Sequence, residues 1–174
     1  MAIQYIVEDG TGMSTATSYI SLVDAKQYWE NLGYDYSALS DDQLSVLFNK
    51  AAKAVDGQYR LRFPGYRKLD TQTLEWPRYD AYYYDGWDIL SSEIPEELGW
   101  AVAEMGYASN QGTDIRPVQA PEGMAISVAV KAGPVSEAKT YLYGSPSGRS
   151  RINAVEDLLK RILLPGNGLV LRRI

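Results

Sequence analysis

The sequence predicts a mainly α-helical fold: a small bundle of about four helices with an appended β-hairpin and an extended C-terminal arm. Apolar residues recur at helical spacing in four segments, and most of these segments begin with a capping residue. One pair of alternating segments flanks a Gly-Pro turn, as in a hairpin. The chain has 174 residues, 45% of them hydrophobic and 22% charged, which suffices for one globular core. No run approaches the ~18 apolar residues of a membrane span, and no signal peptide is recognisable, so we expect synthesis in the cytoplasm without membrane contact.

Residues 1–20 are predicted to form an N-terminal arm that leads into the first helix. Ser21 is a suitable N-cap for a helix over 22–32, and Gly33 suits the position after its end. One face of this helix carries an apolar stripe at helical spacing, made of Leu22, Ala25, Trp29 and Leu32.

The second helix has the clearest start signal in the chain. Ser40 and Gln43 have the spacing of a capping box, and the helix is expected to continue to about Gln58. Asp41 and Asp42 complement the helix N-terminus, so we interpret them as capping charges and not as a catalytic pair. The predicted buried face is Leu44, Leu47, Phe48, Ala51 and Val55.

Residues 59–94 show no sustained period and are predicted to be a long aromatic loop within a bundle core spanning 21–112. Such length suggests a contact role. Five residues are therefore candidates for a subunit or tail-side contact: Trp76, Arg78, Tyr82, Tyr83 and Tyr84.

The arginines of this loop have two interpretations. Arginine interleaved with aromatic residues can hold single-stranded nucleic acid, through Arg60, Arg62, Arg67 and Arg78. Alternatively, the aromatics cover the helix bundle while the arginines pair with Asp70, Glu75, Asp80 or Asp85. The acidic composition of the chain favours the second interpretation.

A third helix is predicted between Pro95, placed at its first position, and Gly112 after its end. Its small residues allow another helix to approach closely, and Glu104 is interpreted as a paired or solvent-reaching surface residue. The buried stripe is Leu98, Ala101, Val102, Met105 and Ala108.

Residues 113–148 are predicted to be a connector and a β-hairpin, with a turn at 132–135. An isolated hairpin is marginally stable in water, so we expect it to pack on the helices or on a neighbouring subunit. Residues 149–174 are predicted to be a fourth helix, capped by Ser150, followed by an arm. The inward side chains of that helix are Ile152, Val155, Leu159 and Ile162.

Composition and charge restrict the classes of function that are possible for this chain. There is no cysteine or histidine, which excludes disulfides, imidazole-based triads and histidine-ligated zinc, and no carboxylate set has the spacing of a metal enzyme. We therefore expect no enzyme activity, no cofactor and no metal. Residues 1–148 contain 11 basic and 20 acidic side chains, whereas residues 149–174 contain six basic and two acidic. The chain ends with four aliphatic and two arginine side chains that are predicted to be buried on another protein or, alternatively, on the chain's own hairpin: Leu169, Val170, Leu171, Arg172, Arg173 and Ile174.

An ordered set of short motifs resembles the head–tail adaptor proteins of tailed bacteriophages, also called head completion or connector proteins. The motifs are Val7 to Gly12, Ser18 to Ser21, Tyr28-Trp29, Leu44 to Ala54, Leu74 to Arg78, Ile94-Pro95 and Val130 to Val135. The same group carries the label of DnaT-like single-stranded DNA-binding protein, which keeps that function as an alternative.

The resemblance implies a homo-oligomeric ring of twelve copies under the portal protein, at the head–tail junction of the virion. It also implies that residues 169–174 dock on the portal and that the bundle supports the next tail component, a stopper or tail completion protein. Genomic double-stranded DNA would pass through the channel without sequence-specific binding, because an acidic wall repels phosphate.

Overall fold

The computed structural model describes residues 3–115, 125–131, 136–141 and 152–164. The chain divides into two units, a helical bundle formed by the described residues of 3–115 and 152–164, and a hairpin within 116–150. The helices are α1 (Leu22–Leu32), α2 (Asp41–Tyr59), α3 (Glu96–Asn110) and α4 (Asn153–Leu159). The strands are β1 (Tyr66–Arg67), β2 (Arg78–Tyr79), β3 (Ala125–Lys131) and β4 (Ser136–Tyr141). The predicted mainly α-helical fold with a hairpin is confirmed.

The first two helices begin where their capping residues predict. The Ser21 hydroxyl accepts a hydrogen bond from the Asp24 amide at 3.1 Å, and Gly33 ends α1 in the left-handed region at φ 71°. Ser40 and Gln43 form the predicted capping box at the start of α2. Helix α2 ends at Tyr59, one residue past the predicted Gln58.

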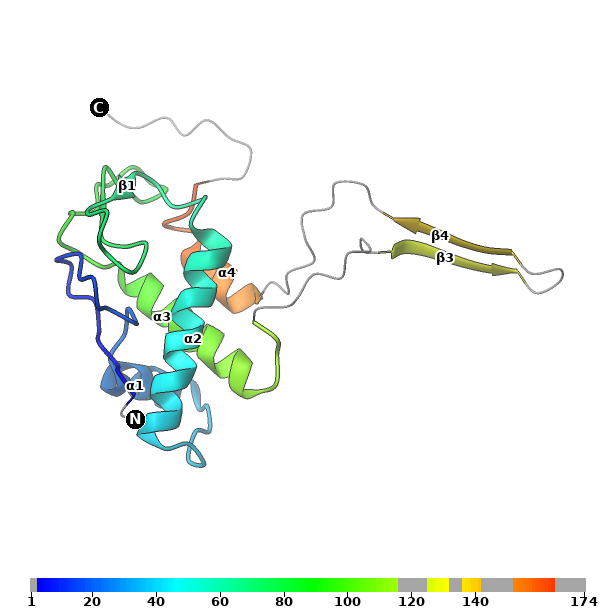
Figure 1. The fold of residues 1–174 in the computed structure, drawn as a ribbon, viewed down its shortest axis with the longest axis horizontal. Coiled ribbons are helices and arrows are strands. Elements are labelled where there is room, and N and C mark those ends of the chain that lie inside the picture. The colour runs from blue at the N-terminus through cyan, green and yellow to red at the C-terminus, as the bar shows by residue number, and fades with distance from the viewer. Residues whose placement is uncertain (1–2, 116–124, 132–135, 142–151, 165–174) are drawn as a thin grey trace. The chain divides into compact units, whose positions relative to one another are not determined.

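Helix α2 packs along α3, and α4 packs on α3 (Figure 1). The close approach of α2 and α3 depends on a small residue, because a Cβ at Gly106 would lie 2.9 Å from the Phe48 ring. Trp29 of α1 fills the space beside Phe48, with ring centroids 5.1 Å apart, and its indole N–H donates to the Ala103 carbonyl. The predicted apolar stripes therefore form one core, although Leu32 is exposed because it lies in the last turn of α1.

Two helix starts differ from the prediction. Pro95 is the N-cap of α3 and not its first helical residue, since its ψ of 133° is extended while its carbonyl accepts from the Leu98 amide. Helix α4 begins at Asn153, and Ile152 at its N-cap offers no side-chain acceptor. The predicted cap, Ser150, lies outside the described residues. Ile162 is buried as predicted, but from the turn after α4 has ended.

The hairpin is described by its backbone. Strands β3 and β4 pair antiparallel, with Val128 opposite Lys139, which confirms the predicted pairing. The predicted turn at 132–135 lies outside the described residues. Packing of the hairpin on the helices or on a neighbouring subunit stays a prediction.

Candidate functional site

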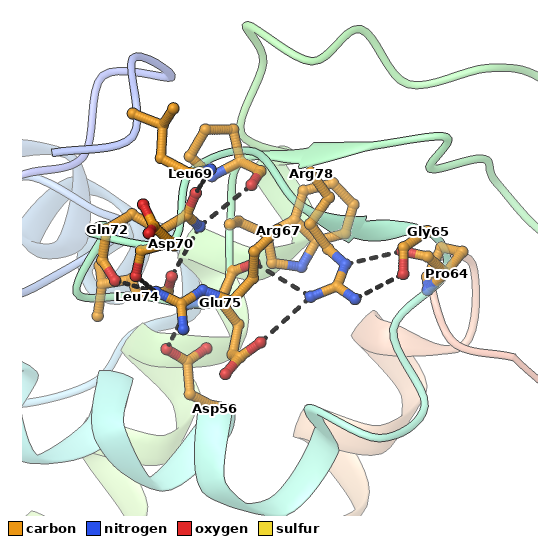
Figure 2. A network of polar contacts seen from close by, with 12 residues as sticks. Asp56, Pro64, Gly65, Arg67, Leu69, Asp70, Gln72, Leu74, Glu75 and Arg78 are labelled. Atoms are coloured by element: carbon orange, nitrogen blue, oxygen red, sulfur yellow. Dashed lines mark hydrogen bonds and ion pairs between the residues drawn. The ribbon is translucent and has the colours of Figure 1, made fainter.

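Arg78, a candidate contact residue, points into its own chain. Its guanidinium donates to the Pro64 carbonyl at 2.7 Å, to the Gly65 carbonyl at 2.8 Å and to the Glu75 carboxylate at 3.2 Å (Figure 2). Only 6% of the residue is exposed, and burial lowers the pKa of the guanidinium. A planar group with several fixed donors can join two loop segments, 64–65 and 75–78, in this way, so Arg78 organises the loop.

Trp76 is also internal. It is fully buried, and its ring meets the edge of Phe63 with centroids 5.8 Å apart. The prediction of a subunit or tail-side contact for Trp76 and Arg78 therefore finds no exposed surface at either side chain. The alternative interpretation, in which aromatics cover the bundle and an arginine pairs with Glu75, describes this part of the loop correctly.

A partly buried carboxylate in α2 connects this loop to the N-terminal arm. Asp56 accepts from the Tyr19 hydroxyl at 2.7 Å and from the Glu75 amide at 3.1 Å. Burial raises the pKa of Asp56 to about 7, against the two hydrogen bonds and the nearby Arg67 charge, which lower it. The Tyr19 hydroxyl in turn accepts from the Trp76 amide at 3.1 Å. These contacts have a structural role, because they tie three distant segments together.

The N-terminal arm is organised by another buried carboxylate. Glu8 accepts from the amides of Gly10, Gly12 and Met13 at 3.1, 2.8 and 2.8 Å. Lys68 of the long loop donates to the Gly10 carbonyl at 3.0 Å. The arm and the loop thus form one layer, in which Glu8 satisfies backbone donors and is not available as a catalytic group.

The remaining loop arginines differ in their availability. Arg62 pairs with Glu156 at 3.5 Å and Arg67 donates to the Asp70 carbonyl at 3.2 Å, so both are engaged within the bundle. Arg60 is exposed at the end of α2. Of the four arginines predicted to hold a single strand, only Arg60 is in the exposed class.

Arg60 belongs to a row of basic residues that the sequence interpretation missed. Lys50 and Lys53 precede it on the same face of α2: Lys53 lies about one turn after Lys50, and Arg60 about two turns after Lys53. We call Lys50, Lys53 and Arg60 the α2 basic stripe. In the described part of the chain these three side chains have no hydrogen-bond or ion-pair partner. Beside the stripe lies an open groove of about 330 Å³, lined mainly by Ile3, Leu39, Val46, Leu47 and Lys50. The signal was present in the sequence as basic residues three and seven positions apart.

The three tyrosines predicted for a contact lie in a turn that we call the aromatic tip, residues 82–90. The Tyr83 amide donates to the Trp87 carbonyl at 2.8 Å, which closes the turn. Tyr82 and Tyr83 are half-buried, and the Arg161 guanidinium lies 4.9 Å from the Tyr83 ring centre. Tyr84 and Trp87 are 66% and 72% exposed, and Leu90 is 61% exposed. The aromatic tip therefore retains the exposed apolar surface that a contact requires.

The described surface is acidic. In the described residues of the helical bundle, fourteen aspartate and glutamate residues are exposed, compared with five lysine and arginine residues. Two of those five cations are already paired, Lys160 with Asp157 and Arg161 with Glu97. A single strand would meet mostly repulsive charge on this part of the molecule, apart from the α2 basic stripe.

Glu104 differs from its predicted surface position. It is buried, and it accepts hydrogen bonds from the hydroxyls of Tyr28 at 3.0 Å and Tyr34 at 3.3 Å. Burial and the neighbouring carboxylate raise the pKa of both tyrosines, so they stay protonated as donors. Within the described ranges there is no cluster of metal-ligating side chains, and no helix there is long and apolar enough for a membrane crossing. The predicted portal contact at 169–174 lies outside the described residues.

One protein family matches this chain. Residues 3–174 match the model of a family described as "Putative DnaT-like ssDNA binding protein". The chain belongs to this family. The match covers nearly the whole sequence, including both described units. No curated protein and no solved structure gives a match.

Proposed function

We propose that this family member is a non-enzymatic structural adaptor of a tailed bacteriophage, which forms a ring under the portal and joins the capsid to the tail. The observation that carries the proposal is the direction of the side chains in the long loop. Arg78 and Trp76 face inward, while Tyr84, Trp87 and Leu90 are exposed. Exposed apolar side chains gathered on one ordered turn favour contact with protein.

The charge distribution supports the same proposal. The exposed charged residues of the bundle are mostly acidic, as described above, and the chain carries a formal charge of −5. An acidic wall would let double-stranded DNA pass without retention, because phosphates are repelled and no counterions are released by binding. In this proposal twelve copies form the ring, and the bundle supports the stopper or tail completion protein.

The proposed portal contact is residues 169–174, where four aliphatic side chains and two arginines follow one another. The test is a pull-down of the full chain and of a chain lacking 165–174 with purified portal protein. We expect the deletion to abolish docking while the helical circular dichroism and the thermal midpoint are retained. A matched control is Lys160→Ala, which removes an exposed cation in the preceding helical turn and is expected to dock normally. Undiminished docking of the deleted chain would contradict the assignment.

Single-stranded DNA binding is the second candidate function. The family description favours it, and so does the α2 basic stripe, the one row of unpaired cations among the described residues. The exposed rings of Tyr66 and Tyr79 lie in the loop that follows α2, with centroids 5.7 Å apart, and provide apolar faces on which bases could stack.

Fluorescence anisotropy with a labelled oligothymidine tests this second function. If it is correct, binding at ~0.1 M salt weakens steeply as salt rises and is lost when Lys50, Lys53 and Arg60 are changed to Gln. The adaptor proposal expects no measurable binding of either chain. The two functions therefore give opposite results in one assay.

A further inference from the structure

Two exposed surfaces of the bundle present side chains that make no hydrogen bond or ion pair within the described part of the chain. One is the α2 basic stripe with the open groove beside it, and the other is the aromatic tip. Both belong to ordered parts of the same unit, and they use different residues. Each presents apolar side chains to solvent.

The α2 basic stripe combines cations with aliphatic surface. The groove beside Lys50 is lined by Ile3, Leu39, Val46 and Leu47, and beyond the stripe Leu61 is 88% exposed. The carboxylate of Asp42 also lines the groove, but it lies eight residues before Lys50, about 12 Å along the helix axis. The half of the helix that carries the stripe is therefore positive on a protein whose exposed charges are mainly negative.

The aromatic tip carries the opposite charge to the α2 basic stripe. Between Tyr84 and Trp87 the chain carries Asp85, and Asp88 follows directly; both carboxylates are exposed. Backbone hydrogen bonds attach the tip to the bundle: the Tyr84 amide donates to the Arg161 carbonyl at 2.6 Å, and the Ile89 amide donates to the Ala81 carbonyl at 2.9 Å. It is therefore a fixed projection with an apolar, acidic end.

We propose that the aromatic tip of one copy docks against the α2 basic stripe and its groove on a second copy of the chain. Tyr84 and Trp87 would enter the aliphatic groove, while Asp85 would face Lys50 and Lys53. Charge complementarity selects this occupant, because the tip is acidic and the stripe is the part of the described surface with unpaired cations. The inference rests on the proposed function in that both require self-association.

This contact is heterologous: the two copies use different surfaces, so an open assembly has a free tip at one end and a free stripe at the other until it closes. Repetition of one such contact produces a ring where the rotation between copies closes, which is the architecture that an adaptor under a portal needs. A protein occupant also fits the groove at the start of the stripe, because the aliphatic side chains of Val46 and Leu47 line it beside Lys50.

Charge reversal with rescue tests the contact. The stripe variant is Lys50→Glu with Lys53→Glu, and the tip variant is Asp85→Lys. Sedimentation velocity over a range of concentrations gives the self-association constant of the full chain, of each variant and of an equimolar mixture of the two. We expect each variant alone to weaken association by ~10-fold or more, and the mixture to recover it at the reversed contact. Circular dichroism establishes that both variants are folded.

Two further measurements make the test specific. Trp87→Ala should weaken association without changing the net charge, and the matched exposed-aromatic control Trp100→Ala should not. Association of both charge variants at the strength of the unchanged chain would overturn the docking proposal, and so would a mixture that fails to recover. If the stripe variant associates normally but loses oligonucleotide binding, the stripe is a nucleic-acid site instead.

Failure of this docking contact can be distinguished from failure of the proposed adaptor function. A ring that forms without the tip or the stripe contradicts this contact alone. A chain that is monomeric at every concentration and does not dock on a portal contradicts the adaptor proposal as well.

Discussion

Replacing Arg78 by Met should destabilise the bundle strongly while leaving its surface unchanged. The substitution removes the donors that serve the carbonyls of Pro64 and Gly65 and leaves the Glu75 carboxylate, which is 19% exposed, without its cation. Removal of one partner from a buried ion pair costs about 3–5 kcal/mol. With a urea dependence of about 1–3 kcal/mol per molar, that loss moves the unfolding midpoint down by roughly 2 M.

Urea unfolding followed by tryptophan fluorescence measures this effect. Arg78→Lys should lose a smaller amount, because an ammonium keeps the charge but cannot reproduce the planar fork of donors. The control is Lys160→Met, at an exposed ion pair, which should leave the midpoint unchanged. A urea midpoint for Arg78→Met close to that of the unchanged protein would refute the internal role of this arginine. Arg78 would then again be a candidate for contact with a ligand.

Two further predictions concern the contacts of the N-terminal arm. Because burial raises the pKa of Asp56 from 3.8 to about 7, the folded state binds more protons than the unfolded state between these values. Stability contributed by Asp56 is therefore full below about pH 4 and is lost as the pH rises through 7, by at most ~4 kcal/mol. Asp56→Asn should remove this pH dependence, so the difference in unfolding free energy between the two proteins should change between about pH 4 and pH 7. An identical pH dependence in both proteins would exclude the assignment. Gly10→Ala should lower the thermal midpoint by several degrees, because Gly10 has φ +91° and a Cβ there would lie 1.9 Å from the Ser92 carbonyl oxygen. A thermal midpoint within about one degree of that of the unchanged protein would show that the arm does not pack there.

The helices could be predicted from the sequence because their signals are local. Ser21, Gly33 and the Ser40 capping box fix helix ends within a few residues, and the apolar spacing fixes the buried faces. The start of α4 could not be predicted in this way, since Ile152 provides no capping side chain and packing of the helix decides where it begins.

The internal direction of Arg78 could not be settled from the sequence, because it depends on carbonyls that the folded loop brings together. Pro64 and Gly65 lie more than ten residues before Arg78, and no local pattern records that approach. Glu104 illustrates the same limit, since its partners Tyr28 and Tyr34 come from another part of the chain. The α2 basic stripe, by contrast, could have been predicted from the helical spacing of its residues alone.

Electron microscopy of the protein bound to its portal tests the central claim most directly. The account predicts a closed ring with rotational symmetry against the portal, with the last residues of each copy in contact with portal density and the aromatic tips between neighbouring copies. Isolated 19.4 kDa chains that leave the portal bare, together with tight binding to single-stranded oligonucleotide, would contradict it.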